Sequence, residues 1–569
     1  MKAIKIKRLF VFLLVCATVA FAQQENVPVS NPVYGFLKRM EVKGKIERYH
    51  DAVLPLSRAE VAQFLVTIEE KKNLLSEAEQ GWLSDFIAEF RLEIDGKTEN
   101  FHRLIESEQK SFGAAVGKIF SDREKFLYFH TDSTLSFFMN GLLDFDARRI
   151  NGDALGKEHT EYLQAGGRVR GTVFGHLGYY AQWTNAQFWG SRELLIRDPI
   201  ISQSHALQVM DIQNFDFAES YVRYGTDVIS AQVGRERVLW GTGYDQKMTL
   251  SDNVRPYDFI RFDAQYKSLK YTFLHAWLVG TPGKVVFTVP ADTSARFTED
   301  VADDKYFVAH RVELSLPGLF DIGFQEMLIY SNRSPDLAYL NPLTIIESSQ
   351  RSRGERDNAF WEFDLQLHFI PGIELSGSIT FDDINIPILF SDKWNALYAW
   401  QAGMFYADMF GIANTNLMVE YTRIEPYVYS HARSRDDNYT NLDRILGPRI
   451  GPNADSWFIR VDYLPLRNLT FSFRANSDRK GENILDANGQ VIKNVGSDVF
   501  LPHRSNDPET KIWLDGNLIK SRTLDFRVSW EVVNQIWLEG RYLFESVKNV
   551  ATGAWNENST AMFHVRTEF

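Results

Sequence analysis

The chain has 569 residues, of which 44% are hydrophobic and 14% aromatic, with a formal net charge of −12 and a mean hydropathy of −0.26. The acidic balance argues against nucleic acid as a partner, because phosphate binding needs a basic surface. Beyond the N-terminus we find no run of about twenty apolar residues, so helical membrane spans are not expected.

Residues 1–22 have the pattern of a secretory signal peptide. A basic start precedes a short apolar stretch at 9–15, and Ala20-Phe-Ala22 has the small-x-small form of a cleavage site. The stretch is too short to span a bilayer, although an uncleaved anchor is the alternative. Cleavage after Ala22 would remove Cys16, the one cysteine, and would leave no disulfide or thiolate metal site.

Residues 31–95 predict a small periplasmic bundle of three short helices. Asn31 is suited to the N-cap, and two capping boxes begin at Ser57 and Ser76. Apolar residues then follow at i, i+3, i+4 and i+7 in each segment. Helices with one apolar face bury that face against each other or a partner, so we expect a structural or docking role.

From about residue 113 the apolar period changes to two. The clearest alternating segments are 361–369, 373–381, 457–463, 524–532 and 536–544. Alternation directs one face to lipid and the other to a polar lumen. We therefore expect a mainly β protein in which residues 113–569 form a large antiparallel transmembrane β-barrel of about 16–18 strands. A soluble sandwich would also alternate, but the export signal and the C-terminus favour the barrel.

Turns of two lengths fit this barrel. Short turns at 368–373, 463–469 and 532–536 are expected on the periplasmic side. Long polar stretches at about 282–304, 331–358, 424–455 and 477–521 are expected as extracellular loops.

The last ten residues alternate and end on Phe569. A terminal aromatic that closes such a strand is typical of the signal read by the barrel insertion machinery in the outer membrane. We expect Phe569 to serve as that signal.

The densest cluster of candidate binding residues lies in the segment 235–257. Its members are Arg235, Glu236, Arg237, Trp240 and Tyr244, followed by Asn253, Arg255 and Tyr257. Sugar binding favours flat aromatics beside charged groups, and arginine can hold a uronate carboxylate with two hydrogen bonds. The alternative is an internal Arg–Glu network that braces the barrel wall.

The alternation of side chains along the strand raises a question about where the arginines of this cluster point. Arg235 and Arg237 share a strand face with Ile229, Ala231 and Val233. If that face meets lipid, the arginines must lie beyond the hydrocarbon, or a bulge at Gly234 must reset the register.

Further candidate residues lie outside this segment. Arg351, Arg353 and Arg356 lie on a loop that could meet an acidic polymer, although a solvated loop is an equal alternative. Trp183 and Trp189 suit either a second site or an interface girdle. No twelve-residue calcium loop, G-x-S-x-G elbow or HExxH motif is found, so we predict no metal, no cofactor and no catalytic residue.

Several segments, taken in order, resemble the Wzi-type capsule assembly proteins of the outer membrane. They are Val27–Leu37, Leu54–Arg58, Gly234–Gly243, Leu250–Asn253, Leu340–Pro342 and Asp357-Asn358. The resemblance implies a helical bundle at the periplasmic mouth of a barrel of about 18 strands. It also implies a surface lectin that holds capsular or exopolysaccharide, and it does not imply an enzyme.

We therefore expect a non-enzymatic outer-membrane protein that binds capsular or exopolysaccharide and helps attach or assemble it at the surface. Expected partners are that polysaccharide, outer-membrane lipids, the barrel insertion machinery and the polysaccharide export machinery. The alternative function is an outer-membrane diffusion channel for small solutes, which would need an open lumen.

Overall fold

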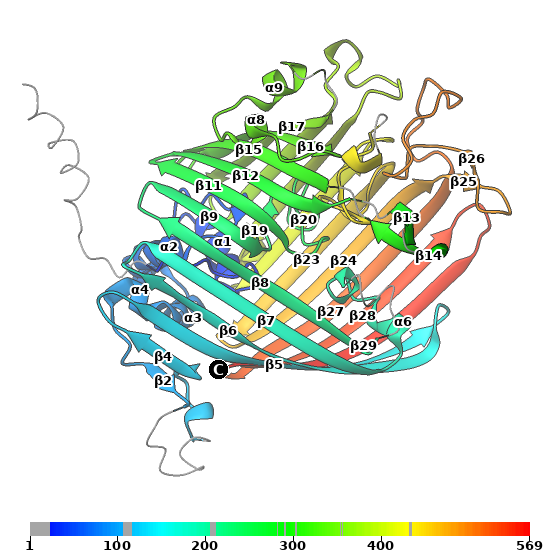
Figure 1. Cartoon of the computed structure of the whole chain (residues 1–569). Helices are drawn as coiled ribbons and strands as arrows, with labels where there is room; N and C mark the ends of the chain where they lie inside the picture. The colour runs from blue at the N-terminus through cyan, green and yellow to red at the C-terminus, as the bar shows by residue number, and fades with distance from the viewer. Residues whose placement is uncertain are drawn as a thin grey trace, which may run out of the picture.

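The computed structural model describes residues 23–105, 117–204, 207, 212–280, 283–289, 292–301, 304–352, 354, 357–431 and 435–569. Eighteen antiparallel strands close into a barrel, which confirms the predicted fold class and strand number (Figure 1). These strands are β5 (Ser136–Gly152), β6 (Gly156–Val173), β7 (Leu177–Gly190), β8 (Asn214–Gly225), β9 (Ile229–Glu236), β11 (Tyr257–Tyr266), β12 (Leu269–Val279), β15 (Asp304–Leu316), β16 (Phe320–Ser331), β17 (Asn358–Ile370), β18 (Ile373–Asp382), β19 (Tyr398–Ala407), β20 (Thr415–Ile424), β23 (Ala454–Leu466), β24 (Leu469–Glu482), β27 (Asn517–Val533), β28 (Ile536–Asn549) and β29 (Trp555–Glu568).

Barrel strands that follow one another in the chain are neighbours in the sheet. The last strand, β29, pairs antiparallel with β5 from Glu568↔Leu142 to Asn558↔Gly152 and so closes the cylinder. The backbone N–H of Phe569 donates to Gly141 O at 2.9 Å, which continues that pairing to the final residue. Closure leaves no unpaired sheet edge, which a barrel in lipid requires.

The tight turns occur where the sequence predicts them. β17 and β18, β23 and β24, and β27 and β28 are joined by short connections at one end of the barrel. The four long polar stretches connect strands at the other end, which we call the long-loop end. They carry small elements: β13 (Gly283–Val289), β14 (Asp292–Val301), α8 (Leu337–Leu340), α9 (Ile346–Ser352), β21 (Thr440–Asn441), β22 (Arg444–Ile445), β25 (Ile484–Leu485) and β26 (Val491–Lys493).

The segment that carries α8 and α9 packs on the outside of the barrel. Tyr339 and Ile346 form a buried cluster with Tyr306, Leu328 and Tyr330. These strand residues face away from the lumen, because their neighbours Phe307 and Ile329 belong to the luminal core. This connection therefore lies against the outer wall near the long-loop end (Figure 1).

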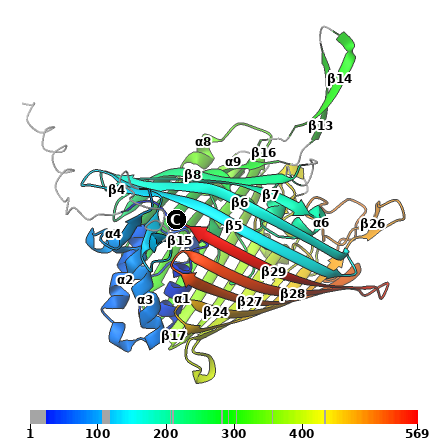
Figure 2. The ribbon, with the colours of Figure 1, turned by 90° about the horizontal axis from the view of Figure 1, so that it is seen from below.

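Residues 31–95 form four α-helices and not the predicted three. Two of them begin at the predicted capping boxes, but the first has Pro32, and not the predicted Asn31, as its N-cap. The four helices are α1 (Val33–Val42), α2 (Arg58–Glu69), α3 (Glu77–Glu89) and a short α4 (Arg91–Asp95). Both capping boxes are formed, with Ser57 and Ser76 accepting from the backbone N–H of Glu60 and Glu79. The helices share one apolar cluster and gather at the barrel end where the C-terminus lies (Figures 1 and 2).

No α-helix in the described part of the chain is both long and apolar enough to cross a membrane. Short elements complete the chain: β1 (Val53–Leu54), β2 (Phe101–Arg103), β3 (Glu124–Phe126), β4 (Tyr128–Thr131), α6 (Arg192–Leu195) and β10 (Leu239–Trp240). The predicted signal peptide, residues 1–22, lies outside the described residues.

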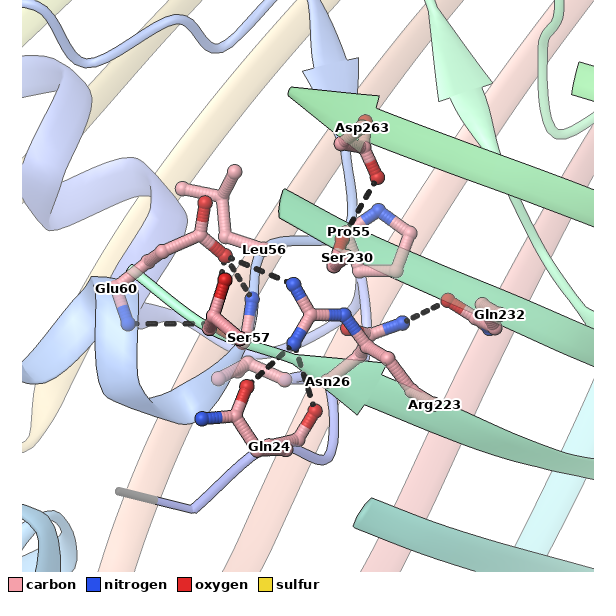
Figure 3. Close-up of polar contacts among 12 residues, drawn as sticks. Gln24, Asn26, Pro55, Leu56, Ser57, Glu60, Arg223, Ser230, Gln232 and Asp263 are labelled. Atoms are coloured by element: carbon pink, nitrogen blue, oxygen red, sulfur yellow. Dashed lines mark hydrogen bonds and ion pairs between the residues drawn. The ribbon is translucent and has the colours of Figure 1, made fainter. Parts of the chain in front are cut away.

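The chain that precedes α1 and α2 is bound to the inner wall of the barrel (Figure 3). Arg223 Nη1 on β8 donates to Gln24 Oε1 at 2.8 Å, and Asn26 Nδ2 donates to Gln232 Oε1 on β9 at 3.0 Å. Arg223 also lies 3.7 Å from Glu60 of α2. Polar inward positions of the strands therefore hold the N-terminal segment in place.

Candidate functional site

A cavity of about 420 Å³ remains in the lumen beside the N-terminal segment. It lies between residues 28–30 and the inner faces of β5–β8, β28 and β29. Its volume falls in the range of about 300–1,000 Å³ that is usual for ligand pockets. We call it the luminal cavity, and its aromatic and charged lining residues are Tyr162, Tyr180, Phe215, Phe217, Arg148, Arg168, Arg237, Arg541, Arg566, Asp144, Asp146, Asp198, Glu219, Glu236, Glu539, His564 and Glu568.

Ion pairs fix four of the five arginines in this cavity, namely Arg148, Arg168, Arg541 and Arg566. Arg148 Nη1 lies 2.9 Å from Asp198, and Arg168 Nη1 lies 2.8 Å from Glu568 Oε2. Asp198 lies in the connection after α6, and this connection folds inward because Asp198 lines the cavity. Charge pairs of this kind orient the wall and leave little charge available for a ligand.

Two lining groups have unused hydrogen-bonding capacity. The Nε–H of Arg237 is shielded from solvent and has no hydrogen-bond partner among the described residues. The half-buried carboxylate of Glu219 forms no hydrogen bond or ion pair within the described part of the chain. A donor and an acceptor beside aromatic rings can bind sugar hydroxyls and the C–H face of a sugar ring.

The predicted cluster at 235–257 is divided between two sides of the barrel wall. Arg235 faces outward and pairs with Asp258, with Nη2–Oδ2 at 2.7 Å, and its side chain is 47% exposed. The register of β9 with β8 and β11 runs through Gly234 without a shift, so the bulge considered for this position is absent and that alternative is wrong. A Cβ at Gly234 would lie 2.3 Å from Ser220 O, which explains the glycine.

Glu236 and Arg237 face the lumen. Glu236 accepts from Asn26 Nδ2 at 2.7 Å and from Gln232 Nε2 at 2.8 Å. Arg237 Nη2 donates to Gln203 Oε1 at 3.1 Å. Glu236 therefore belongs to an internal network, but amides donate to it, so the Arg–Glu pairing considered for this segment is not formed at Glu236 within the described residues.

Trp240 and Tyr244 belong to the packed interior. Trp240 is fully buried in the luminal core, and its Nε1–H donates to Gln325. Tyr244 OH donates to Glu374 Oε1 at 2.9 Å, and burial raises the Tyr244 pKa well above its ordinary value. The buried Trp240 ring presents no free face to a ligand, whereas Tyr244 is half-buried.

The residues that follow also hold the inward segment in place. Asn253 Nδ2 donates to Ile445 O at 2.8 Å, and Tyr257 is buried at the start of β11. Arg255 lines a small recess with Ser202 and Arg444. Burial lowers the Arg255 pKa.

The remaining candidates lie apart from the cavity. Arg351 is 68% exposed and pairs with Glu347 on α9, whereas Arg353 and Arg356 lie outside the described residues. Trp183 and Trp189 point outward and are about half exposed, in keeping with the girdle alternative.

A buried charge network joins α1 to the barrel wall. Lys38 Nζ lies 2.9 Å from Asp51, 2.6 Å from Glu374 and 3.1 Å from Glu41. Burial is the largest single effect on Lys38 and opposes its charge, but attraction to Asp51, Glu374 and Glu41 together outweighs burial and raises the Lys38 pKa. Burial raises the Glu41 pKa to about 8.

Glu41 also belongs to a group with the spacing of metal ligands. Glu41, Asp321 and His368 each offer one ligand atom, and these atoms lie within 4.8 Å of one another. His368 Nε2 and Asp321 Oδ2 are already 3.1 Å apart and bond each other. The absence of a metal stays a prediction.

The luminal cavity was not predicted from the sequence. Its charged and aromatic residues are spread over strands far apart in the chain, such as Arg148 on β5 and Arg541 on β28. The signal available in the sequence was the alternation within each strand, because residues that alternate with lipid-facing ones must face the lumen. Which of these positions stay free depends on where the inward segments pack.

The sequence also matches a family model, described as capsule assembly protein Wzi, over residues 147–561. The chain belongs to the Wzi family. The description of this family names capsule assembly. The matched region includes nearly the whole barrel. No curated protein matches the sequence.

The fold of this Wzi-family chain is similar to that of a solved β-barrel structure. Wzi of Escherichia coli, described as a carbohydrate-binding β-barrel of the outer membrane involved in group 1 capsule assembly, superimposes with a TM-score of 0.54 at 12% identity, over 95% of this chain and 99% of that one. OccK5 of Pseudomonas aeruginosa has a TM-score of 0.41 at 10% identity, over 76% and 98%. A BenF-like porin of Pseudomonas fluorescens has 0.42 at 11%, over 76% and 99%.

Proposed function

We propose that this chain binds capsular or exopolysaccharide at the outer membrane and helps attach or assemble it at the cell surface, without catalysing a reaction. Membership of the Wzi capsule assembly family is the observation that carries the proposal. The E. coli relative with the same fold is described as carbohydrate-binding, which supports the same ligand class here.

The luminal cavity is our proposed saccharide site. Arg237 Nε and the Glu219 carboxylate would bond sugar hydroxyls, and the Tyr162 ring would pack against a sugar face. The other candidates in segment 235–257 have structural contacts inside the barrel, so we assign them to the support of this site, except Arg235, which faces outward and has no part in it. The exposed Arg351 would meet the polymer only outside the barrel.

The orientation follows from the two ends of the barrel. We propose that residues 1–22 direct export, that α1–α4 face the periplasm and that the long-loop end faces outward. The C-terminal strand, closed by Phe569, would be recognised by the insertion machinery. Contact of α1–α4 with the export machinery would then be possible from the periplasmic side.

The filled lumen argues against the diffusion-channel alternative. Met248, Leu250 and Tyr439 come from connections between strands, yet they pack with inward residues such as Phe259 and Phe307 in one core. A channel for small solutes would need this cross-section to contain water instead.

A deletion strain complemented with variants tests the proposal. Wild type should restore cell-bound polysaccharide, whereas Glu219→Gln together with Arg237→Gln should release most of it into the medium. Arg235→Gln, on the outer face of β9 and two residues before Arg237, is the matched control and should behave like wild type. Unchanged retention in the deletion strain itself would contradict the proposal.

A further inference from the structure

Basic side chains form a row on the outer face of the barrel near the long-loop end. Arg479 on β24, Lys520 on β27 and Lys548 on β28 are successive cross-strand partners. Arg522 lies on the same face of β27, opposite Ser477 and Ser546 in the register. We call Arg479, Lys520, Arg522 and Lys548 the basic row. The basic row lies on the same face of the sheet as Phe526, whose side chain is 50% exposed on the outside of the barrel.

The charges in this row are only partly compensated. Arg479 Nε donates to Asp455 Oδ1 at 2.9 Å, and Lys548 Nζ lies 4.7 Å from the centroid of an indole ring. Lys520 and Arg522 are exposed and have no ion-pair partner among the described residues. Like charges directly opposite each other on adjacent strands are destabilising, so an anion between them would stabilise the wall.

An apolar groove of about 570 Å³ lies on the same strands. Its outward-facing lining consists of Val461, Tyr463, Phe471, Phe473, Phe526, Val528, Gly540 and Tyr542. Gly540 leaves the groove open, because a Cβ built there has no heavy atom within 4 Å. The groove therefore results from a missing side chain between aromatic neighbours on β24, β27 and β28.

The spacing of the two features matches one amphiphilic ligand. Arg522 lies four positions from Phe526 along β27, which is about 13 Å. The groove lies in the lipid-facing band, and the basic row lies towards the long-loop end, where a headgroup layer would begin. A free anion would explain the row but not the groove.

We propose that the basic row and the groove together bind a phosphorylated lipid of the outer leaflet, with its phosphate on Lys520 and Arg522 and an acyl chain over Gly540. The inference rests on the outer-membrane orientation in the proposed function, but not on polysaccharide binding. Basic side chains near a membrane surface each raise the affinity for anionic lipid about fivefold.

Native mass spectrometry of the detergent-solubilised full chain tests this assignment with three probes. They are lipid A, lipid A stripped of its phosphates, and inorganic phosphate. Lipid A should bind to wild type, and Lys520→Gln with Arg522→Gln should weaken it about 25-fold. Removal of the phosphates should weaken binding similarly, and inorganic phosphate alone should not bind.

Two further variants complete the design. Arg235→Gln should leave lipid A affinity unchanged, since its outward guanidinium is already paired with Asp258. Gly540→Leu should fill the groove and weaken both lipids. If the double variant fails to insert, Gly540→Leu alone decides the question.

Undiminished lipid A binding in Gly540→Leu or in the double variant would overturn the proposal, as would equal binding of the stripped lipid. Binding of inorganic phosphate at the same concentration would identify a free-anion site instead and would also overturn it. Polysaccharide binding is measured on the same samples and should not change, so a failure of the proposed function is seen separately.

Discussion

Neighbouring residues of one segment have unrelated surroundings in this barrel. Arg235 meets the outside of the wall, Glu236 bonds the N-terminal segment, and Trp240 fills the lumen. Because successive strand residues alternate between lipid and lumen, a dense cluster of functional residue types in the sequence is not a cluster in space. Burial and free hydrogen-bonding capacity distinguish the residues that hold the wall from those that can meet a ligand.

Trp240 gives a direct test of the packed lumen. Trp240→Ala should lower the free energy of unfolding by about 3–5 kcal/mol, because it leaves a cavity and removes one hydrogen bond to Gln325. Denaturant unfolding in detergent micelles measures this loss. Trp183→Ala, at an outward and half-exposed position, should cost less, and equal losses would count against a packed lumen.

Glu41 predicts a pH dependence of the contact between α1 and the wall. Burial raises its pKa to about 8, so the folded state keeps a proton that the unfolded state loses near pH 4.3. Stability should therefore fall as pH rises between these values, by up to about 1.4 kcal/mol per pH unit. Attraction to Lys38 lowers the Asp51 pKa against the effect of burial, so Asp51 acts only below about pH 4.

Hydrogen exchange of the α1 amides, measured at about pH 5 and about pH 8 and corrected for the intrinsic exchange rate, tests this dependence. Protection of these amides should be lower at the higher pH. Glu41→Gln should abolish the dependence. Lys38, Glu374 and His368 also face Glu41, so a dependence that persists in Glu41→Gln would assign it to one of those groups instead.

At the scale of elements, the N-terminal helices and the inward segments determine what space the barrel leaves. Capping residues start α2 and α3, and inward polar residues of β8 and β9 bind the chain between Gln24 and Asn26. The connection before β11 then adds Met248 and Leu250 to the core. The luminal cavity is the space left beside these segments.

The cap at Ser57 is testable within one helix. Ser57→Ala should lower the local stability of α2 by about 1 kcal/mol, which is about fivefold faster exchange of its amides. Thr67→Ala, an exposed position in the same helix, should have little effect. Equal exchange in both variants would mean that barrel contacts, and not the cap, hold α2.

The barrel was predictable because apolar and polar residues alternate within each strand and so show which side chains face lipid and which face the lumen. The alternation in 524–532 and 536–544, the short turns and the four long connections all agree with the structure. The helix starts were equally readable from Ser57 and Ser76. The cavity was not, since it depends on long-range packing that no local period encodes: Arg168 meets Glu568, 400 residues away.

At the scale of the whole molecule, a closed sheet surrounds a filled interior. The fold separates an apolar outer band from a polar and packed inside, and it joins the N-terminal helices to the barrel at one end (Figures 1 and 2). That arrangement suits a surface-binding protein more than a pore for small solutes.

Single-channel recording tests the difference at this scale. The purified chain in a planar bilayer should show no steady large conductance, because the luminal core closes the cross-section. A constant ohmic conductance like that of a general porin would support the diffusion channel.

Calorimetric titration of the purified full chain with the polysaccharide of its own host tests the central claim most directly. We predict saturable binding that Glu219→Gln with Arg237→Gln weakens at least tenfold, in line with the loss of about 1.5–3 kcal/mol for a charged hydrogen bond. Arg235→Gln should bind like wild type. Absence of binding, or binding that the double variant leaves unchanged, would contradict the account.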